Sequence, residues 1–253
     1  MASPTLPSSL SLVDYPLYDD ATQMERRIER YPLSFTRTPN EPLIARPLTR
    51  SERTGPRNFG NLFGIAPGDV DLSRATPTSP LAMGQRIWIE GRVVDEDGRP
   101  IPNAVMEIWQ ANSAGRYVHE MDDNLATPVD PNFHGTGRLM TGKEGEFRLQ
   151  TIKPGAYPVL GTGWWWRPPH VHFSIFGMSW MDRYITQIFF PGEPLNETDL
   201  LFNGVRDEEA RQRLLFQPLT PSMGKPGKAD EPSLIGYKLD FVLRGKRATP
   251  EVD

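Results

Sequence analysis

Short segments typical of β-strands recur along this chain, and turns rich in glycine and proline separate them. The 253 residues include 26 prolines and 22 glycines, which predict many turns and few long helices. Strands at such short intervals favour a sandwich or a barrel over alternating strands and helices. We therefore expect an all-β fold, a β-sandwich that forms a single domain over residues 1–253. The expected strands are 86–94, 105–110, 146–152, 170–176, 184–190 and 236–243.

Two regions depart from this pattern of strands. Residues 1–60 are rich in proline and arginine and predict an irregular N-terminal arm, with one short helix over 20–31. Eight arginines lie between residues 26 and 57, but acidic residues are interspersed among them and the net charge of the chain is −4. We therefore expect the arm to make subunit contacts, and we expect no nucleic-acid partner. Further along, Asp207 predicts the N-cap of a second short helix that runs to Phe216.

The composition narrows the chemistry that the chain can perform. It contains no cysteine, which excludes disulfides, thiolate-bound zinc, iron–sulfur clusters and cysteine nucleophiles. Any bound metal must therefore be held by nitrogen and oxygen atoms. The chain has no apolar run of about 18 residues that could span a membrane, and its first residues lack the basic and apolar regions of a secretion signal. We expect a cytoplasmic protein with no membrane partner.

A histidine pair is the strongest chemical signal. His170 and His172 lie two residues apart in an expected strand, and strand side chains alternate between faces, so both imidazoles should project from one face. Two of the four histidines of the chain are in this strand, beside Arg167 and a run of tryptophans. An isolated His-x-His is more often a polar strand face than a metal site, so the pair needs further ligands to be convincing.

The remaining ligands must come from upstream, because no histidine follows His172 and the next acidic residue is Asp182. Two tyrosines with two histidines would form a hard, anionic set suited to a trivalent ion such as Fe(III). Tyr157 is a favourable candidate because two prolines brace its loop. Spacing alone does not choose among the upstream candidates, which are Tyr117, His119, Glu120, Asp122, Asp123, His134 and Tyr157.

A set of motifs in one order resembles the intradiol ring-cleavage dioxygenases. The motifs are W-Q-A-N-S-A-G-R-Y (109–117), D-P-N-F (130–133), T-I-K-P-G-A-Y-P (151–158), W-R-P-P-H-V-H-F (166–173), I-T-Q (185–187) and F-V-L-R-G (241–245). The resemblance runs from about residue 31 to the C-terminal tail, and it is strongest to the β chains of members that cleave protocatechuate. It implies a mixed-topology β-sandwich enzyme that inserts both atoms of O2 into a catechol ring, giving 3-carboxy-cis,cis-muconate in aromatic compound degradation.

The resemblance also implies a role for individual residues. Tyr117, Tyr157, His170 and His172 match the four ligands of a non-haem Fe(III), with Tyr157 and His172 as the axial pair and Tyr157 as the ligand that substrate displaces. Arg167 matches an arginine that stabilises negative charge on the bound ring, and Gln187 matches a glutamine that lines the pocket. In the two-chain members an α chain completes the pocket and binds the substrate carboxylate, so we expect an α partner in (αβ)n assemblies.

This sequence departs from the family pattern near the expected mouth of the site. Val159 stands where the family has tryptophan, Pro169 stands where it has alanine, and residues 160–166 contain three consecutive tryptophans. The ring substituent of the substrate is therefore less certain than the reaction.

Two other functions stay open on the residues alone. One is a transthyretin-like binding module with a structural histidine pair, which requires that Tyr117 and Tyr157 lie apart from the histidine strand. The other is a zinc hydrolase that uses the pair with Glu120 or Asp122.

Overall fold

The computed structural model describes residues 20–32, 34–37, 39, 41, 70–120, 122, 124–177, 183–219 and 234–252. Its elements in chain order are η2 (Asp20–Thr22), α1 (Ser34–Arg37), β1 (Val70–Asp71), β2 (Arg86–Val94), β3 (Val105–Trp109), β4 (Thr136–Met140), β5 (Glu146–Ile152), β6 (Tyr157–Pro158), β7 (Trp166–Arg167), β8 (His170–Phe176), β9 (Arg183–Phe189), η3 (Pro194–Glu197), α4 (Leu200–Gly204), α5 (Glu208–Gln212), β10 (Gln217–Pro218) and β11 (Ile235–Val242).

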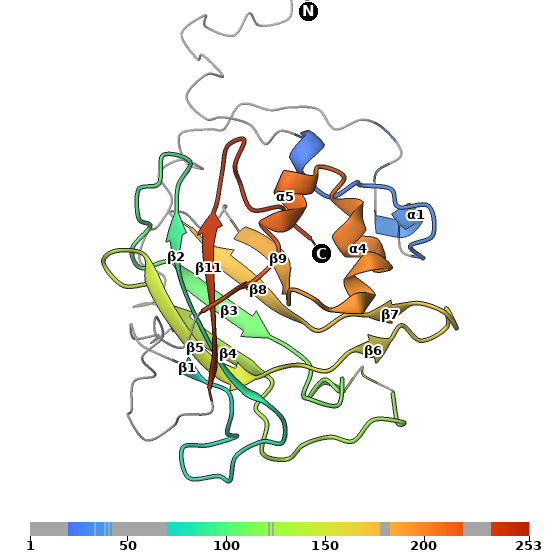
Figure 1. Ribbon diagram of the computed structural model, residues 1–253, viewed down its shortest axis with the longest axis vertical. Helices are drawn as coiled ribbons and strands as arrows, with labels where there is room; N and C mark the ends of the chain where they lie inside the picture. Colours follow the sequence, from blue (N-terminus) through green and yellow to red (C-terminus); the bar gives the residue numbers. More distant parts are fainter. Residues whose placement is uncertain are drawn as a thin grey trace, which may run out of the picture.

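The strands form two main sheets that pack face to face, as Figure 1 shows. The first sheet has the order β1-β5-β2-β11-β10, and the second has the order β4-β3-β8-β9. Strands β1 and β5 pair in parallel, as do β2 and β11, whereas the other pairs are antiparallel. The prediction of an all-β sandwich of mixed topology is confirmed.

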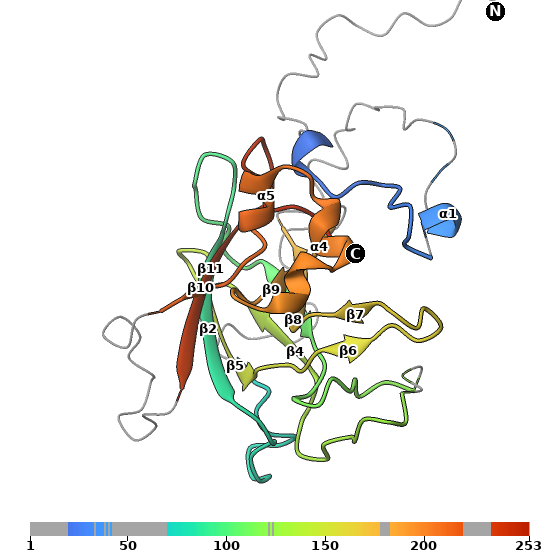
Figure 2. The same ribbon diagram turned by 45° about the vertical axis from the view of Figure 1, so that its right-hand side comes forward.

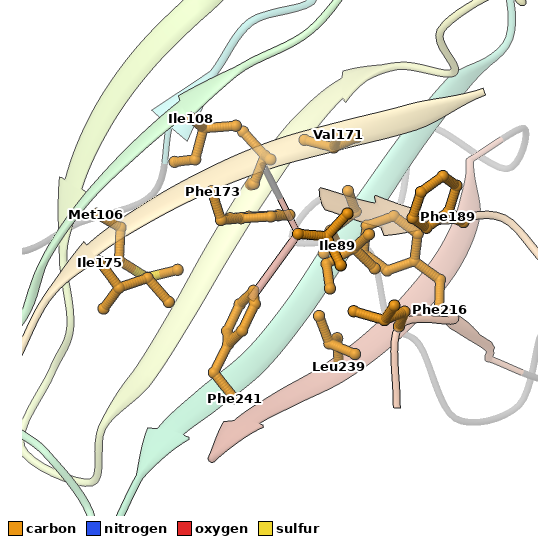
Figure 3. Close-up of a cluster of buried hydrophobic side chains, with 14 of the residues drawn as sticks. Ile89, Met106, Ile108, Val171, Phe173, Ile175, Phe189, Phe216, Leu239 and Phe241 are labelled. Carbon is orange, nitrogen blue, oxygen red and sulfur yellow. The ribbon is translucent and has the colours of Figure 1, made fainter. Parts of the chain in front are cut away.

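Apolar side chains from both sheets meet between them and form the core (Figure 3). Strand β8 contributes Val171, Phe173 and Ile175, which are completely buried. The ring of Phe173 packs against Phe241 of β11, with ring centroids 4.9 Å apart. Because side chains alternate along a strand, burying these residues turns His170 and His172 to the opposite face of the second sheet. The core therefore fixes the direction of the histidine pair.

Three of the expected strands have the predicted bounds, and three are shifted or shortened by one residue. Strand β4 was not predicted, because its region has the polar composition of a loop. Its first three residues are exposed or half-buried, and backbone pairing with β3 holds the strand in place. Pairing of this kind is invisible in a single segment.

The helix predicted through Phe216 is present but shorter. Asp207 caps α5 as predicted, since its Oδ1 accepts a hydrogen bond from the backbone N–H of Ala210. The helix ends early because Leu215 forms a parallel bridge to Phe189 and Phe216 enters the core. Figures 1 and 2 show α4 and α5 together beside the end of β9. No helix in the described ranges has the length and apolar character required to cross a bilayer.

The helix predicted over residues 20–31 is wrong, because only the single turn η2 forms there. Met24 makes an antiparallel bridge to Val205, and the backbone N–H of Glu25 donates to the carbonyl of Gly204. The apolar spacing serves tertiary packing, and Ile28 lies against Gly204. Most of the predicted arm, including its arginines beyond residue 41, lies outside the described residues.

Candidate active site

Four side chains that were predicted as metal ligands converge on one point. The Oη atom of Tyr117 lies 3.0 Å from Nε2 of His172, 3.4 Å from Oη of Tyr157 and 3.5 Å from Nε2 of His170. The Oη atom of Tyr157 lies 3.3 Å from Nε2 of His170, and the two Nε2 atoms are 3.1 Å apart. Five of the six possible atom pairs are thus in contact. The sixth pair, Tyr157 with His172, shows no such contact in the described structure.

Two loops carry the tyrosines to the histidine strand. Tyr117 follows β3, and its backbone N–H donates to Oδ2 of Asp122 at 2.8 Å. Tyr157 begins β6. Gly115, in the Tyr117 loop, packs closely on the Tyr157 loop. It has a φ of +81°, and a Cβ at this position would lie 2.3 Å from the carbonyl oxygen of Ala156. Only glycine combines this backbone conformation with so close an approach.

The imidazole rings are oriented from the side away from the centre. Nδ1 of His170 donates to the carbonyl oxygen of Pro168 at 2.6 Å, which leaves the lone pair of its Nε2 directed at the centre. Trp109 lies next to His172 in the register of β3 and β8 and stacks on it. Nδ1 of His172 is buried and has no hydrogen-bond partner among the described residues. On this side, the imidazole of His172 is therefore held by stacking on the indole of Trp109 and by no hydrogen bond from a described residue.

Burial controls the charge of the four groups when no cation is present. Burial and then the positive charge of Arg167 lower the pKa of His172 to about 3, and the same two causes lower the pKa of His170 well below its usual value. Burial raises the pKa of both tyrosines, and the neighbouring Tyr157 raises the pKa of Tyr117 further. The site thus presents neutral imidazoles, and only a strongly charged cation would keep the phenols ionised.

Arg167 lies beside this group and is itself buried. It pairs with Tyr157 across the β6–β7 ribbon. Its Nε donates to Oδ2 of Asp199 at 2.7 Å, and its Nη2 donates to Oε1 of Gln187 in a short hydrogen bond. Burial by itself would lower the pKa of Arg167, but Asp199, together with Tyr157 and Tyr117, more than offsets it, so the pKa is raised. The guanidinium is therefore a fixed positive charge at the edge of the site.

The other upstream candidates do not complete the site. Asp122 supports the Tyr117 loop, because it accepts from the backbone of Tyr117 and pairs with Arg116 at 3.3 Å. His119, Glu120 and His134 are exposed. Asp123 lies outside the described residues. Within the described part of the chain, no three or more residues of the types His, Cys, Asp and Glu are grouped so as to hold a metal ion.

Three residues of this region were not singled out from the sequence as functional. Trp109 lies in an expected strand and Trp165 lies in the run of tryptophans before the histidine strand, and core packing is the usual role of such aromatic residues. Asp199 precedes a short helix, which is the signal of an N-cap and nothing more. Neither signal pairs Asp199 with an arginine 32 residues away in the chain.

The geometry agrees with comparisons to known proteins. Residues 54–245 match the protein family described as "Dioxygenase". The chain therefore belongs to this dioxygenase family, in which it is an intradiol ring-cleaving enzyme. It is 43% identical over 223 residues to the protocatechuate 3,4-dioxygenase beta chain of Burkholderia cepacia, covering 87% of this chain and 89% of that protein.

More distant relatives share only part of their length with this chain. The 6-chlorohydroxyquinol 1,2-dioxygenase of Cupriavidus pinatubonensis is 32% identical over 136 residues, which cover 49% of this chain and 46% of that protein. The crystal structure of hydroxyquinol 1,2-dioxygenase from Pseudomonas putida DLL-E4 aligns with a TM-score of 0.52 at 25% identity. That alignment covers 71% of this chain and 61% of that one.

Proposed function

We propose that this chain is the iron-binding β subunit of an enzyme that cleaves protocatechuate with O2 to 3-carboxy-cis,cis-muconate. One observation carries the proposal: the four donor atoms of Tyr117, Tyr157, His170 and His172 converge with five contacts of 3.0–3.5 Å. Such convergence of groups that cannot all donate hydrogen bonds to one another is typical of a metal centre.

The donor set fits a non-haem Fe(III) ion. Phenolate oxygens and imidazole nitrogens are hard to borderline ligands, and the chain has no thiolate to favour a softer ion. The tyrosine pKa values are raised by burial, so a trivalent cation is best suited to ionise both phenols. When bound, Fe(III) would act as a Lewis acid toward a chelating catechol and make its ring carbon susceptible to O2.

The protein side chains would handle protons and charge around the ring. Tyr157 is the ligand that we expect substrate to displace, and its Oη would accept a proton from one substrate hydroxyl as it leaves. Arg167 would offer preorganised positive charge where negative charge develops on the ring. Gln187, whose Oε1 accepts a hydrogen bond from Arg167, would line the pocket and present its amide nitrogen to the substrate.

The substrate and the partner chain are further parts of this proposal. They are supported by the similarity to a protein described as a beta chain of protocatechuate 3,4-dioxygenase. We propose that an α chain completes the pocket and meets the substrate carboxylate, and that residues 1–60 contribute to contacts between chains. We also propose that residues 1–253 act as one catalytic domain.

Of the residues that depart from the family pattern, Val159 and the three tryptophans lie on the β6–β7 hairpin, and Pro169 lies between β7 and β8. Trp165 is buried, whereas Trp164 and Trp166 are 45% and 48% exposed. The backbone N–H of Val159 donates to the carbonyl of Trp165 at 2.8 Å, which closes the hairpin. The departures on the hairpin therefore lie close to Arg167, and none of them falls on the four ligand positions.

The two alternative functions fit the geometry less well. A structural histidine pair in a binding module required the tyrosines to lie elsewhere, but their oxygens are in contact with the imidazoles. A zinc hydrolase required Glu120 or Asp122 at the centre, but Asp122 is occupied by Arg116 and Glu120 is exposed.

A combined metal and absorption experiment tests the proposal. Protein purified with its partner chain should contain one iron for each copy of this chain and show a visible charge-transfer band from tyrosinate bound to Fe(III). Anaerobic addition of protocatechuate should shift the band. Iron-replete protein without colour would contradict the two-tyrosinate site. Stoichiometric zinc in a colourless protein would support the hydrolase. Colour without a shift would argue against protocatechuate and lead to other catechols as substrates.

A further inference from the structure

Asp199 is completely buried, and its two carboxylate oxygens have different partners. Oδ1 accepts a hydrogen bond from the backbone N–H of Phe202 at 2.8 Å and so caps α4. Oδ2 accepts from Nε of Arg167 at 2.7 Å and from the indole N–H of Trp165 at 3.3 Å. Oδ1 therefore caps α4, whereas Oδ2 binds the arginine at the edge of the active site.

Capping alone does not account for this arrangement. Asp207 caps the neighbouring helix α5 with one oxygen in the same way, through the backbone N–H of Ala210 at 2.7 Å. An uncharged asparagine or serine caps a helix about as well as aspartate. A buried carboxylate is therefore unnecessary for the cap, and its burial is costly unless a cation is paired with it. The cation here is Arg167, with side-chain exposures of 7% for the arginine and 0% for Asp199.

The bonds to Arg167 fix the plane of its guanidinium. Nε is held by Asp199 and Nη2 by Gln187, so rotation of the group about its own stem would break at least one of these hydrogen bonds. The indole ring of Trp165 lies 5.5 Å from the central carbon of the guanidinium and limits its displacement. Because the guanidinium is planar, the N–H groups of Nη1 then also point in one fixed direction, as preorganised positive charge requires.

Trp165 extends this network to the hairpin that joins β6 and β7. Its indole N–H binds Asp199, and its ring packs edge-on against Tyr31 at 5.5 Å. Arg167 follows two residues later on β7. The hairpin and α4 therefore meet at the Asp199 carboxylate, and the N-terminal segment packs on the tryptophan that binds this carboxylate.

We propose that Asp199 is a positioning residue for this reaction, which holds the guanidinium of Arg167 in its working orientation, and that Trp165 couples the β6–β7 hairpin to it. The inference rests on the proposed role of Arg167 in stabilising charge on the substrate. Asp199 does not touch substrate in this scheme, and acts only through the arginine.

The test compares Asp199→Asn and Asp199→Ser with Asp207→Asn, in the iron-loaded enzyme with its partner chain. All three variants keep a side chain that can cap a helix, but only the first two remove the carboxylate from Arg167. We expect kcat/KM for protocatechuate to fall by about ten- to a hundredfold in the Asp199 variants. Iron content and the resting visible band should match those of wild type. Asp207→Asn should stay within about twofold of wild type.

A double-variant cycle separates positioning from a general structural defect. In an Arg167→Leu background, Asp199→Asn should cost no further activity, because its effect passes through the arginine. It should also raise the melting temperature of that background, because it removes an unpaired buried charge. Trp165→Phe, which keeps an aromatic ring but removes the indole N–H donor, should lower kcat/KM several-fold in wild type and not at all in the Arg167→Leu background.

Several results would overturn the inference. The first is Asp199 variants that are as active as Asp207→Asn. The second is an equal loss of activity from Asp199→Asn in the wild-type and Arg167→Leu backgrounds. The third is failure of both Asp199 variants to fold, which would show that Asp199 is needed for the fold itself. A fully active Arg167→Leu enzyme would instead contradict the proposed function of the arginine. The two failures are thus distinguishable.

Discussion

The indole ring of Trp109 lies nearly parallel to the imidazole of His172, with ring centroids 4.7 Å apart and planes inclined by 13°. The two residues are paired directly in the register of β3 and β8. Metal-binding histidines usually donate their second ring nitrogen to a carboxylate or a carbonyl. Nδ1 of His172 has no such partner in the described structure, so stacking replaces the usual hydrogen bond.

Trp109→Leu should therefore loosen His172 and weaken metal binding. Loss of supporting contacts to a ligand costs roughly ten- to a hundredfold in metal affinity. Iron retention during dialysis against a chelator measures the effect. Trp88→Leu is the control, because Trp88 is a buried tryptophan on β2 whose ring packs against Arg148, whereas Trp109 is half-buried. Equal iron loss from both variants would show that general destabilisation is the cause.

Arg167→Leu should retain iron and lose most turnover. The guanidinium makes no described contact with the four ligand atoms that would hold the metal, but it supplies positive charge beside Tyr157. Removing one preorganised donor typically lowers kcat by about 10²-fold or more. Steady-state oxygen uptake with protocatechuate checks this. Arg183→Leu, on the exposed start of β9, is a control that should remain active. An active Arg167→Leu enzyme would refute the role.

Gly115→Ala should separate the two tyrosine loops. The new Cβ would need to lie 2.3 Å from the carbonyl oxygen of Ala156, so the loops must move apart. Gly161→Ala is a close control, because Gly161 has a φ of +82° and a Cβ added there would meet no neighbouring atom within 4 Å. Both variants should lose about 1 kcal/mol of stability from backbone strain. Only Gly115→Ala should also lose iron occupancy, measured by metal analysis.

The metal-free protein should become less stable as the pH falls below about 6.5. The pKa of His172 is lowered to about 3 in the folded chain, and that of His170 is also lowered well below its usual value. Below about pH 6.5 the unfolded chain therefore binds protons that the folded chain excludes, and stability is lost. At pH 5 the loss that comes from His172 is on the order of 2 kcal/mol, and His170 adds a loss of the same sign.

Unfolding midpoints of chelated protein between pH 5 and pH 8 measure this slope. A variant with asparagine at both His170 and His172 should show a shallower slope than wild type. His134→Gln, which replaces an exposed histidine, should preserve the slope. An unchanged slope in the double variant would contradict the assignment of buried, neutral imidazoles.

Much of the fold could be predicted from local sequence patterns, whereas the active site could be predicted from them only in part. Alternation along 170–176 was sufficient to place His170 and His172 on one face, because a strand has a fixed period and the core takes the other face. The convergence of Tyr117 with Tyr157 was expected from family resemblance, since it depends on the contact between Gly115 and Ala156 in separate loops.

The failed predictions have a common physical cause. Residues 20–31 have helical apolar spacing, yet bridging to Val205 places them along the sandwich in another conformation. Asp199 was unrecognised because its distinctive partner, Arg167, is brought to it by the tertiary fold. In both cases contacts between distant segments decide the outcome, and a single sequence contains no signal for them.

The parallel pairing of β2 with β11 joins segments from distant parts of the chain. Contacts across such long separations form slowly, because the entropy of closing the intervening loop must be overcome first. Phe241 of β11 packs on Phe173, on the core face of the strand that carries the two histidines. We therefore expect the order of assembly to matter: all four ligand residues leave the ribosome before β11, but their support is complete only after β11 docks. Iron loading would then be a late event, following closure of the sandwich.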